Sequence, residues 1–368
     1  MRMNTVFRGI GVVVGLALIA AAFVLAYVVT PDYVKRLPDD TDTTRSYAGT
    51  FKTLVDAAEV AKGNVAGAIK TNVPLTVQRT VKVEKTSGDT ALVSDSRTTA
   101  AAGTTVEKTD WKYAVDRKTL EATTSHPSSW QVVDAKGLTV SWPLGAQKKT
   151  YVGWRPETET TTPLTYTRSE SKSGVGTYVY DAHLPPTRIT DAQVLASLPP
   201  AVPKATLALV GQLGTLTPQA KLQLAQLLQT MPDPVPLAYT LESTDTFWIH
   251  PETGLVIDTL RAQQRVAGIV DPGSGTFLPL LPVSDVTYQQ TPKSVSDAAN
   301  DAKDAHDVIN FVGTILPVIV GIVGALLIAA VLLIRRRRPR GTATPPPSTP
   351  PSTPTAPPTT PPTTPPTA

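Results

Sequence analysis

A hydrophobic run near the C-terminal end constrains this chain more than any other feature. It covers residues 311–334, which are 24 residues without a charge. A helix needs about 20 apolar residues to cross a bilayer, so the run predicts a transmembrane helix. Arg335, Arg336, Arg337 and Arg338 follow it directly, and basic residues beside a membrane helix remain in the cytoplasm. The residues before the run are therefore expected outside, unless a second helix crosses the membrane.

A second uncharged run, residues 10–29, lies near the N-terminus behind Arg2 and Arg8. One interpretation is a cleaved signal peptide, with the three alanines at 20–22 as part of a cleavage site. The run is longer than the roughly 7–15 apolar residues of a signal peptide. We therefore favour an uncleaved anchor whose basic start stays in the cytoplasm. This predicts a two-pass protein of the plasma membrane with both termini in the cytoplasm.

The two runs divide the chain into five parts. These are a cytoplasmic tail (1–9), a transmembrane helix (10–29), an extracytoplasmic domain (30–310), a second transmembrane helix (311–334) and a cytoplasmic tail (335–368). The last part begins with basic residues and then becomes rich in proline and threonine, with 13 of the 35 prolines of the chain. Such a composition cannot form a packed core, so we expect this tail to be disordered.

The charge of the chain is unevenly distributed. All 30 acidic residues lie in the extracytoplasmic part, whereas seven of the 34 basic residues lie in the tails, which leaves 27 basic residues outside. The basic ends therefore indicate contact with anionic lipid, and we expect no nucleic acid as a partner. The sequence has no cysteine, so it cannot form a disulfide or a thiolate zinc site.

Alternating apolar and polar residues predict a large antiparallel sheet in the extracytoplasmic domain. In the clearest case Leu75, Val77, Val81 and Val83 alternate with polar residues, which is typical of a half-buried strand. Further strands are predicted over 91–99, 104–114, 131–140, 149–154, 164–169, 176–180, 237–243, 247–250, 255–264 and 283–290. A short helix is expected over 56–69, and a polar, helix-permissive segment over 295–310. The fold class is α+β, a mostly antiparallel, barrel-like domain that could enclose a tunnel.

Residues 184–236 interrupt the strand pattern and predict a helical insertion or cap. Three helices are expected, over 190–198, over 205–213, and from Thr217-Pro218 to about residue 230. In the third helix Leu224, Leu227 and Leu228 share one face. This face could belong to a buried helical pair, or to an exposed apolar cap that meets lipid or a partner. These three leucines are candidate lipid contacts.

The sequence shows no motif for catalysis, and we expect neither an enzyme, a metal site nor a cofactor. The four histidines, His126, His183, His250 and His306, lie far apart, and none has the spacing of a helical metal site. An aromatic segment over residues 142–154 stands out instead. Its Trp142, Tyr151 and Trp154 could simply pack in the core, or they could line a cavity for an acyl chain or a sugar. They are the second set of candidate lipid contacts.

Several motifs in this segment and beyond it stand out. They are Ser141-Trp142-Pro143-Leu144-Gly145, Lys148-Lys149-Thr150-Tyr151 with Trp154, Leu37-Pro38-Asp39-Asp40-Thr41-Asp42-Thr43-Thr44, Val73-Pro74-Leu75-Thr76-Val77, Tyr113-Ala114-Val115-Asp116-Arg117, Gly176-Thr177-Tyr178-Val179-Tyr180 and Trp248-Ile249-His250-Pro251-Glu252-Thr253-Gly254. Together they resemble the actinobacterial PorA-like family, roughly over residues 1–335. The resemblance implies a role in assembling envelope glycolipids or lipoglycans. The layout of two membrane helices around one large β-rich domain is also similar to scavenger receptors of class B, which implies a lipid tunnel beneath a helical cap.

We therefore expect a membrane-anchored protein of the cell envelope that binds or transfers lipids or glycolipids, with envelope-assembly proteins as further partners. A different hypothesis is an extracytoplasmic scaffold or sensor that binds a protein partner and reports through the Pro/Thr-rich tail. A porin-like pore is less consistent with the sequence, because its predicted spans are helices, whereas a membrane barrel crosses with strands. An enzyme that acts on envelope glycans is a third class of function.

Overall fold

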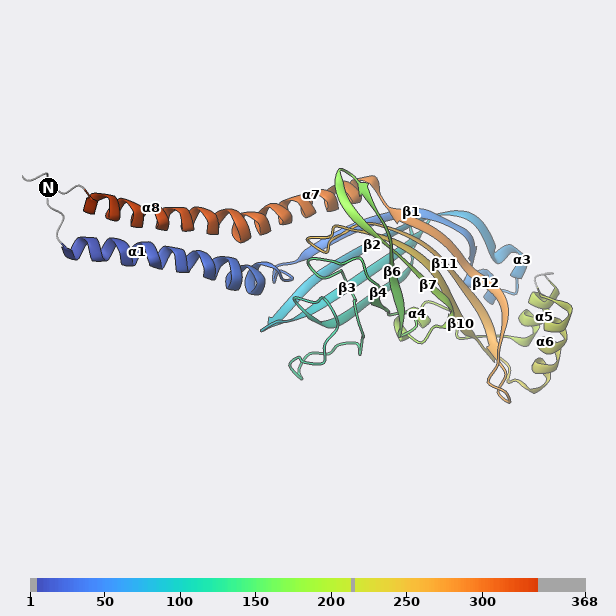
Figure 1. The fold of residues 1–368 in the computed structure, drawn as a ribbon. Helices are drawn as coiled ribbons and strands as arrows, with labels where there is room; N and C mark the ends of the chain where they lie inside the picture. The colour runs from blue at the N-terminus through green and yellow to red at the C-terminus, as the bar shows by residue number, and fades with distance from the viewer. Residues whose placement is uncertain (1–4, 213–215, 337–368) are drawn as a thin grey trace, which may run out of the picture.

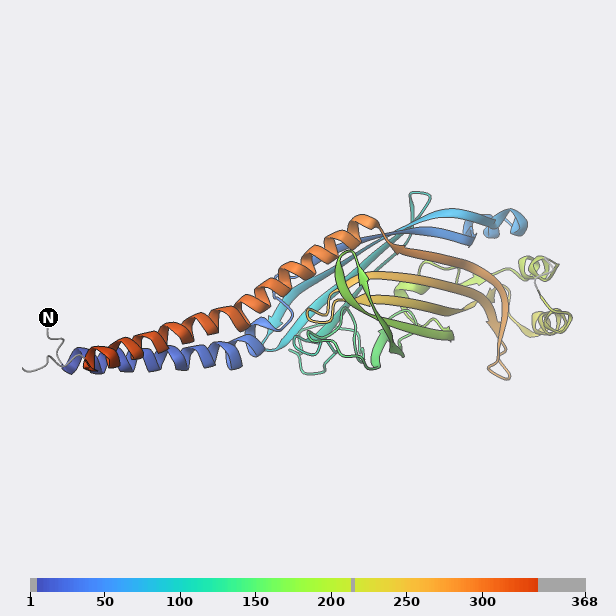
Figure 2. The ribbon, with the colours of Figure 1, turned by 45° about the horizontal axis from the view of Figure 1, so that its top comes forward.

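A computed structural model describes residues 5–212 and 216–336 of the chain. Its main body is an open, ten-stranded antiparallel sheet that curves into a half-barrel, and two long helices leave it at one end (Figures 1 and 2). The mostly antiparallel fold predicted from the sequence is confirmed. The strands of this sheet are β1 (Asp42–Val55), β2 (Ile69–Ser87), β3 (Thr90–Ala101), β4 (Thr104–Asp116), β5 (Tyr151–Arg155), β6 (Thr160–Lys172), β7 (Val175–Arg188), β10 (Ala238–Ile249), β11 (Val256–Val270) and β12 (Phe277–Gln290).

The order of the strands in space is β4-β3-β2-β1-β12-β11-β10-β7-β6-β5. Pairing of β1 with β12 joins the first and the last strand of the chain. The edge strands β4 and β5 are linked by an irregular segment, residues 117–150. Within it Leu138 accepts a hydrogen bond from Trp154 N and donates one to Val152 O, each of 2.8 Å. The sheet is thus open between β4 and β5, and only this loop with its isolated bridges lies between the two edges.

The alternation along β2 separates two faces of the sheet. Leu75 and Val77 are buried, whereas the adjacent Thr76 and Gln78 are exposed. We call the face with Leu75 and Val77 the inner face and the other the outer face. Burial of this apolar row drives the strand onto the core, because each buried Val or Leu side chain contributes roughly 1.5–3 kcal/mol.

Several strand predictions need correction. Residues 131–140 form no strand but an irregular loop, in which Leu138 forms isolated bridges to Glu121 and Gly153. The two strands predicted over 237–250 are one continuous strand, β10. Strand β1 was not predicted at all, because its sequence is rich in threonine and only Tyr47 and Phe51 are buried in it. The helix expected over 56–69 is split into α2 (Ala57–Ala61) and α3 (Val65–Ala68).

The predicted helical insertion begins after β7, at residue 189, and contains three helices as expected. They are α4 (Ala192–Leu195), α5 (Lys204–Gln212) and α6 (Pro218–Thr230), together with a two-stranded ribbon of β8 (Ala201–Val202) and β9 (Val235–Pro236). The expected caps are present, because Asp191 accepts a hydrogen bond from Val194 N at 2.9 Å and Thr217 accepts one from Ala220 N at 3.2 Å. Helices α5 and α6 lie at the end of the half-barrel farthest from the two long helices (Figures 1 and 2).

Both long helices contain apolar stretches that could cross a membrane, within residues 10–31 and 292–333. The first comprises α1 (Thr5–Val24) and the π-helical η1 (Leu25–Val34). The second comprises α7 (Pro292–Asn310), the π-helical η2 (Phe311–Ile315) and α8 (Leu316–Arg336) without a break. A π-helical turn shortly before Pro317 fits the missing N–H of proline, which interrupts the regular pattern of α-helical hydrogen bonds. Arg335 and Arg336 form the last turn of α8, while Arg337 and Arg338 lie outside the described residues.

Helix α7 packs on the outer face of the sheet. Its buried Val295, Ala298 and Ala302 form a cluster with Trp248 and Ile257 of β10 and β11. The neighbouring Phe247 belongs to the other cluster, on the inner face. The amphipathic α7 thereby fixes the helix that continues into α8 directly to the half-barrel.

Helices α1 and α8 lie side by side and run antiparallel (Figure 1). Glycines permit a close approach, since a Cβ atom at Gly324 would lie 2.6 Å from the carbonyl oxygen of Gly15. Small residues at such contacts are typical of packed membrane helices. If the pair crosses a bilayer, the antiparallel arrangement places both ends of the chain on the same side.

The helix pair predicts a specific crosslink. A Cβ atom at Gly321 would lie 3.8 Å from Cβ of Ala22, which is within the roughly 3.5–4.5 Å range of a disulfide. We expect the double variant Ala22→Cys/Gly321→Cys to form a disulfide when membranes that contain it are oxidised. No other disulfide can form within the chain, because its own sequence has no cysteine. The measurement is whether two fragments stay joined after cleavage at a protease site inserted at Gly273. The control is Ala22→Cys/Ile322→Cys, since Ile322 is exposed, and equal crosslinking of both pairs would contradict this packing.

Candidate functional site

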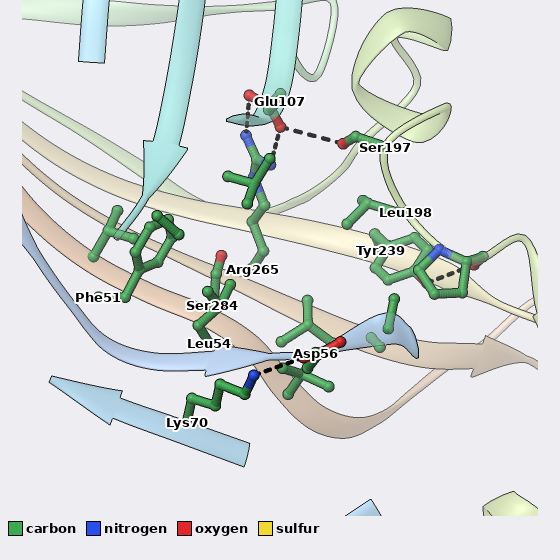
Figure 3. A pocket seen from close by; sticks show the side chains of 18 of the residues that line it. Phe51, Leu54, Asp56, Lys70, Glu107, Ser197, Leu198, Tyr239, Arg265 and Ser284 are labelled. Atoms are coloured by element: carbon green, nitrogen blue, oxygen red, sulfur yellow. Dashed lines mark hydrogen bonds and ion pairs between the residues drawn. The ribbon is translucent and has the colours of Figure 1, made fainter. Parts of the chain in front are cut away.

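A cavity of about 620 Å³ lies on the inner face near α5, and we call it the distal cavity. Its lining is mainly apolar and comes from the sheet and from the insertion, with Phe51, Val77, Val106, Leu207 and Leu281 among its residues. Figure 3 shows part of this lining, with Phe51 and Leu54 on β1 opposite Leu198 and Tyr239. A volume of this size is within the range of about 300–1,000 Å³ that is common for ligand pockets.

A partly buried ion pair interrupts the apolar lining of the distal cavity. Arg265 binds Glu107 through both guanidinium Nη atoms, with Nη2 to Oε1 at 3.1 Å, and Ser197 Oγ contacts Glu107 Oε2 at 3.5 Å (Figure 3). Burial alone would raise the pKa of Glu107, but the charge of Arg265 more than offsets this and lowers it. The ion pairs Asp56–Lys70 and Arg97–Glu157 also line this cavity. The wall is thus mainly apolar with a few polar places, a pattern suited to an amphiphile.

A network of buried charges crosses the inner face next to the distal cavity. Asp95 binds Arg79 through distances of 2.8 and 3.0 Å and Arg97 through 3.1 Å. Arg97 also donates to Glu157 Oε1 at 3.1 Å. Burial alone would raise the pKa of Asp95, but the guanidinium groups of Arg79 and Arg97 hold it at about 2. Asp95 is therefore ionised at neutral pH.

The network continues with a second buried carboxylate. Asp245 binds Arg155 and accepts a hydrogen bond of 2.8 Å from Ser243 Oγ, and Arg261 Nε lies 3.9 Å from its Oδ1. Burial opposes the charge of Asp245, but Arg155 and Arg261 lower its pKa below the ordinary value. The inner face therefore carries a band of four arginines in its middle.

Three cavities lie in line along this inner face. Beside the distal cavity is one of about 50 Å³, which we call the arginine cavity, and next to it one of about 650 Å³ near the start of the long helices, the basal cavity. Arg97 and Glu157 line both the distal and the arginine cavity, whereas Arg79 and Trp142 line both the arginine and the basal cavity. The arginine band therefore separates two large cavities.

The aromatic residues predicted from the sequence lie in this region. Trp142 and Tyr151 are buried in the main core, where both rings contact Tyr180, with centroids 5.4 and 5.8 Å away. Tyr151 also accepts a hydrogen bond of 2.8 Å from Gln147 N. Trp154 is partly buried and lines the arginine cavity together with Trp142. Trp142 thus both packs in the core and lines two cavities, and contact of these aromatic residues with an acyl chain or a sugar stays a prediction.

The predicted leucines of α6 lie elsewhere. Leu224 is buried and Leu227 and Leu228 are partly buried in a cluster with α5, β11 and β12. Among the described residues, no α6 side chain lines the distal cavity, whereas Leu207 of α5 does. The position of Leu224 is thus that of a core residue, and lipid contact by these three leucines stays a prediction.

The structure also brings together two histidines that lie far apart in the sequence. The rings of His250 and His306 are 6.3 Å apart, and His306 Nδ1 contacts a carboxylate oxygen of Glu252. Burial lowers the pKa of His250. In the part of the chain that the structure describes, no group of three or more metal-ligating residues lies together.

The arginine band was not predicted from the sequence, although the sequence contains a signal for it. Arg79 is in phase with the buried Val77 and the partly buried Val81 of β2, and Asp95 and Arg97 are two residues apart on β3. A charged residue at a buried position of an alternating strand needs a partner. Such positions can be recognised in the strand pattern of the sequence. Their partners cannot, because residues such as Arg97 and Glu157 are 60 residues apart.

A family model described as Porin PorA matches residues 9–333. The chain belongs to the PorA family. The predicted family is thereby confirmed, whereas the likeness to scavenger receptors is not. No curated protein matches the chain.

Similar solved structures include a MaoC-like dehydratase with 11% identity and a TM-score of 0.13, for which 76% of this chain and 82% of that chain are covered. Another is the acyl-CoA thioesterase II TesB2 from Mycobacterium marinum, with 14% identity and a TM-score of 0.13 over 74% and 87% of the two chains. Likenesses this weak carry no argument about fold or function.

The family description names a porin, but the described part of this PorA-family chain has a different construction. Its sheet is open between β4 and β5, and exposed residues on the outer face of β2 include Thr76, Gln78, Lys82 and Glu84. A membrane barrel instead presents an apolar band to the lipid on a closed sheet. Within residues 5–212 and 216–336, two apolar helices are long enough to cross a membrane.

Proposed function

We propose that this protein binds a lipid or glycolipid in the distal cavity and holds or passes it within the cell envelope. The observation that carries the proposal is the size and apolar character of that cavity on the inner face of an anchored half-barrel. An acyl chain gains free energy on leaving water for such a lining, at about 0.8 kcal/mol per buried CH₂. The Glu107–Arg265 pair supplies polar contacts for the other part of the molecule.

The anchors support an extracytoplasmic position for the half-barrel. With the arginines at 335–338 in the cytoplasm, α1 and α8 cross the plasma membrane and the sheet stands outside it. Anionic lipids of the inner leaflet hold the basic ends. In the envelope of an actinobacterium, the cargo of such a protein is a membrane lipid or an envelope glycolipid, and the protein supports glycolipid or lipoglycan assembly. The proposal assigns binding to the site, without a catalytic step or a cofactor.

The test compares two exposed apolar residues. Val106 lines the distal cavity, and Leu222 lies on the solvent side of α6. We expect Val106→Glu to reduce the lipid that copurifies with the full-length protein severalfold, because a carboxylate in contact with an acyl chain loses hydration. Leu222→Glu should leave it unchanged, and both variants should keep the melting temperature. The measurement is mass spectrometry of lipid per protein in detergent-purified samples.

Two results would contradict the proposal. Wild-type protein that carries no lipid above the level of an unrelated membrane protein would favour a scaffold or a sensor. Equal lipid content in Val106→Glu and wild type, with lipid present in both, would place the cargo elsewhere than in the distal cavity.

A further inference from the structure

The arginine cavity carries an excess of hydrogen-bond donors. Arg97 Nε, Arg155 Nε and Nη2, and the indole N–H groups of Trp142 and Trp154 are buried and have no hydrogen-bond partner among the residues that the structure describes. All four residues line this one cavity. Each of these five atoms can only donate, and a buried donor without an acceptor costs about 1–3 kcal/mol. The cavity thus has the hydrogen-bonding pattern of a site for an acceptor.

The charges around the cavity point to an acceptor that is negative. Four arginines, Arg79, Arg97, Arg155 and Arg261, face three carboxylates, Asp95, Glu157 and Asp245. The three carboxylates neutralise three of the four arginines, so the cluster keeps one positive charge. Burial of an unpaired charge is strongly unfavourable, and one singly charged anion would balance this cluster.

The size of the cavity limits the anion to a small group. Its volume of about 50 Å³ corresponds to a few water-sized groups, since one such group needs roughly 10–15 Å³. A carboxylate or a singly charged phosphate fits this space, whereas an acyl chain or a sugar ring does not. Planar guanidinium groups suit these oxyanions, because their N–H bonds match two oxygens of one group.

We propose that the arginine cavity is a binding site for one small oxyanion, a carboxylate or a singly charged phosphate. The anion accepts hydrogen bonds from Arg97, Arg155, Trp142 and Trp154. It is either a free ion or the headgroup of the amphiphile in the adjoining distal cavity. The second case rests on the proposed function, and it makes the cargo an anionic lipid whose chain lies in the distal cavity.

The test uses full-length protein in detergent, both as purified and after removal of copurified lipid, with formate and inorganic phosphate as probes. Ionic strength is held constant with a bulky sulfonate too large for the cavity. We expect each probe to raise the melting temperature of the lipid-free protein with a saturable dose dependence. If a probe raises the melting temperature of both preparations, the natural occupant of the cavity is a free ion. If a probe raises it only after lipid removal, the natural occupant is a lipid headgroup.

A mild variant tests the location. Loss of Arg155 could unfold the protein, so the variant is Trp154→Phe, which removes one donor and no charge. One hydrogen bond to an anion contributes about 1.5–3 kcal/mol, so the apparent affinity for formate should fall at least about tenfold. The matched control, Trp130→Phe, changes a tryptophan that does not line the cavity and should respond like wild type.

Two outcomes would overturn the anion site. Absence of a saturable response in lipid-free wild-type protein would mean that the cavity holds water. An equal response of Trp154→Phe and wild type would mean that the probe binds elsewhere. The lipid content of the same samples is recorded independently, so failure of the anion site is distinguishable from failure of the lipid-binding proposal.

Discussion

Asp245→Ala is expected to destabilise the protein by about 3–5 kcal/mol, the largest effect on stability that we expect from a single side chain. Asp245 is fully buried and neutralises both Arg155 and Arg261. Its removal leaves two guanidinium groups inside the half-barrel with too few acceptors, and loss of one partner of a buried ion pair typically costs this much. The measurement is chemical unfolding of the full-length protein at pH 7, followed by far-UV circular dichroism.

The matched control is Asp42→Ala. Asp42 pairs with Lys82 at 2.9 Å, but both side chains are about half exposed, so its loss should cost less than about 1 kcal/mol. The pKa of Asp245 is lowered from 3.8, so its contribution is fully present above pH 3.8 and is lost as the pH falls below that value. The difference between wild type and Asp245→Ala should therefore shrink in acid. Equal effects of the two substitutions at pH 7 would contradict the role assigned to the buried network.

Ser284→Trp is expected to remove most of the copurified lipid while the protein stays folded. Ser284 lines the distal cavity between Leu54 of β1 and Arg265 of β11, which are its partners in the sheet (Figure 3). An indole at this position would occupy space that the proposed acyl chain needs. Overpacking of a tight core costs about 1–3 kcal/mol, but the cavity can take up the added ring, so we expect a smaller loss of stability.

The readouts are lipid per protein by mass spectrometry and the melting temperature of the full-length protein. Thr76→Trp is the control, because Thr76 is exposed on the outer face of β2, and it should leave both readouts unchanged. Undiminished lipid in a folded Ser284→Trp variant would show that the cargo does not use the distal cavity.

The local pattern of the sequence was sufficient for most strands. Along β2 each buried residue alternates with an exposed one, so a strand follows from the residues themselves. Strand β1 lacks this signal. It is held between β2 and β12 by backbone pairing, and at Gly49 a Cβ atom would lie 2.1 Å from the carbonyl oxygen of Thr287. A strand whose stability comes from its neighbours cannot be recognised from its own side chains.

The candidate site was predictable only in part. Trp142 and Trp154 attracted notice as bulky aromatic residues close together in the sequence, and both line the arginine cavity. Which residues surround them depends on how segments 60 to 90 residues apart meet, as Arg97 meets Glu157 and Arg155 meets Asp245. The cavity wall depends in the same way on the insertion. The leucines of α6 have the clearer helical pattern, yet α5 provides the lining, because α6 packs behind it.

The unbroken helix from α7 to α8 has a mechanical consequence. Its 42 residues from 292 to 333 measure about 63 Å at a rise of about 1.5 Å per residue, of which a bilayer core takes about 30 Å. The first part of α7 packs on the outer face of the sheet through Val295, Ala298 and Ala302, and the helix continues from there into α8 without a break. With such a continuous helix as its connection, the half-barrel would not bend toward the membrane. If the protein binds lipid as proposed, its distal cavity would stay at a constant distance from the membrane, and the donor and the acceptor of the lipid would have to reach it there.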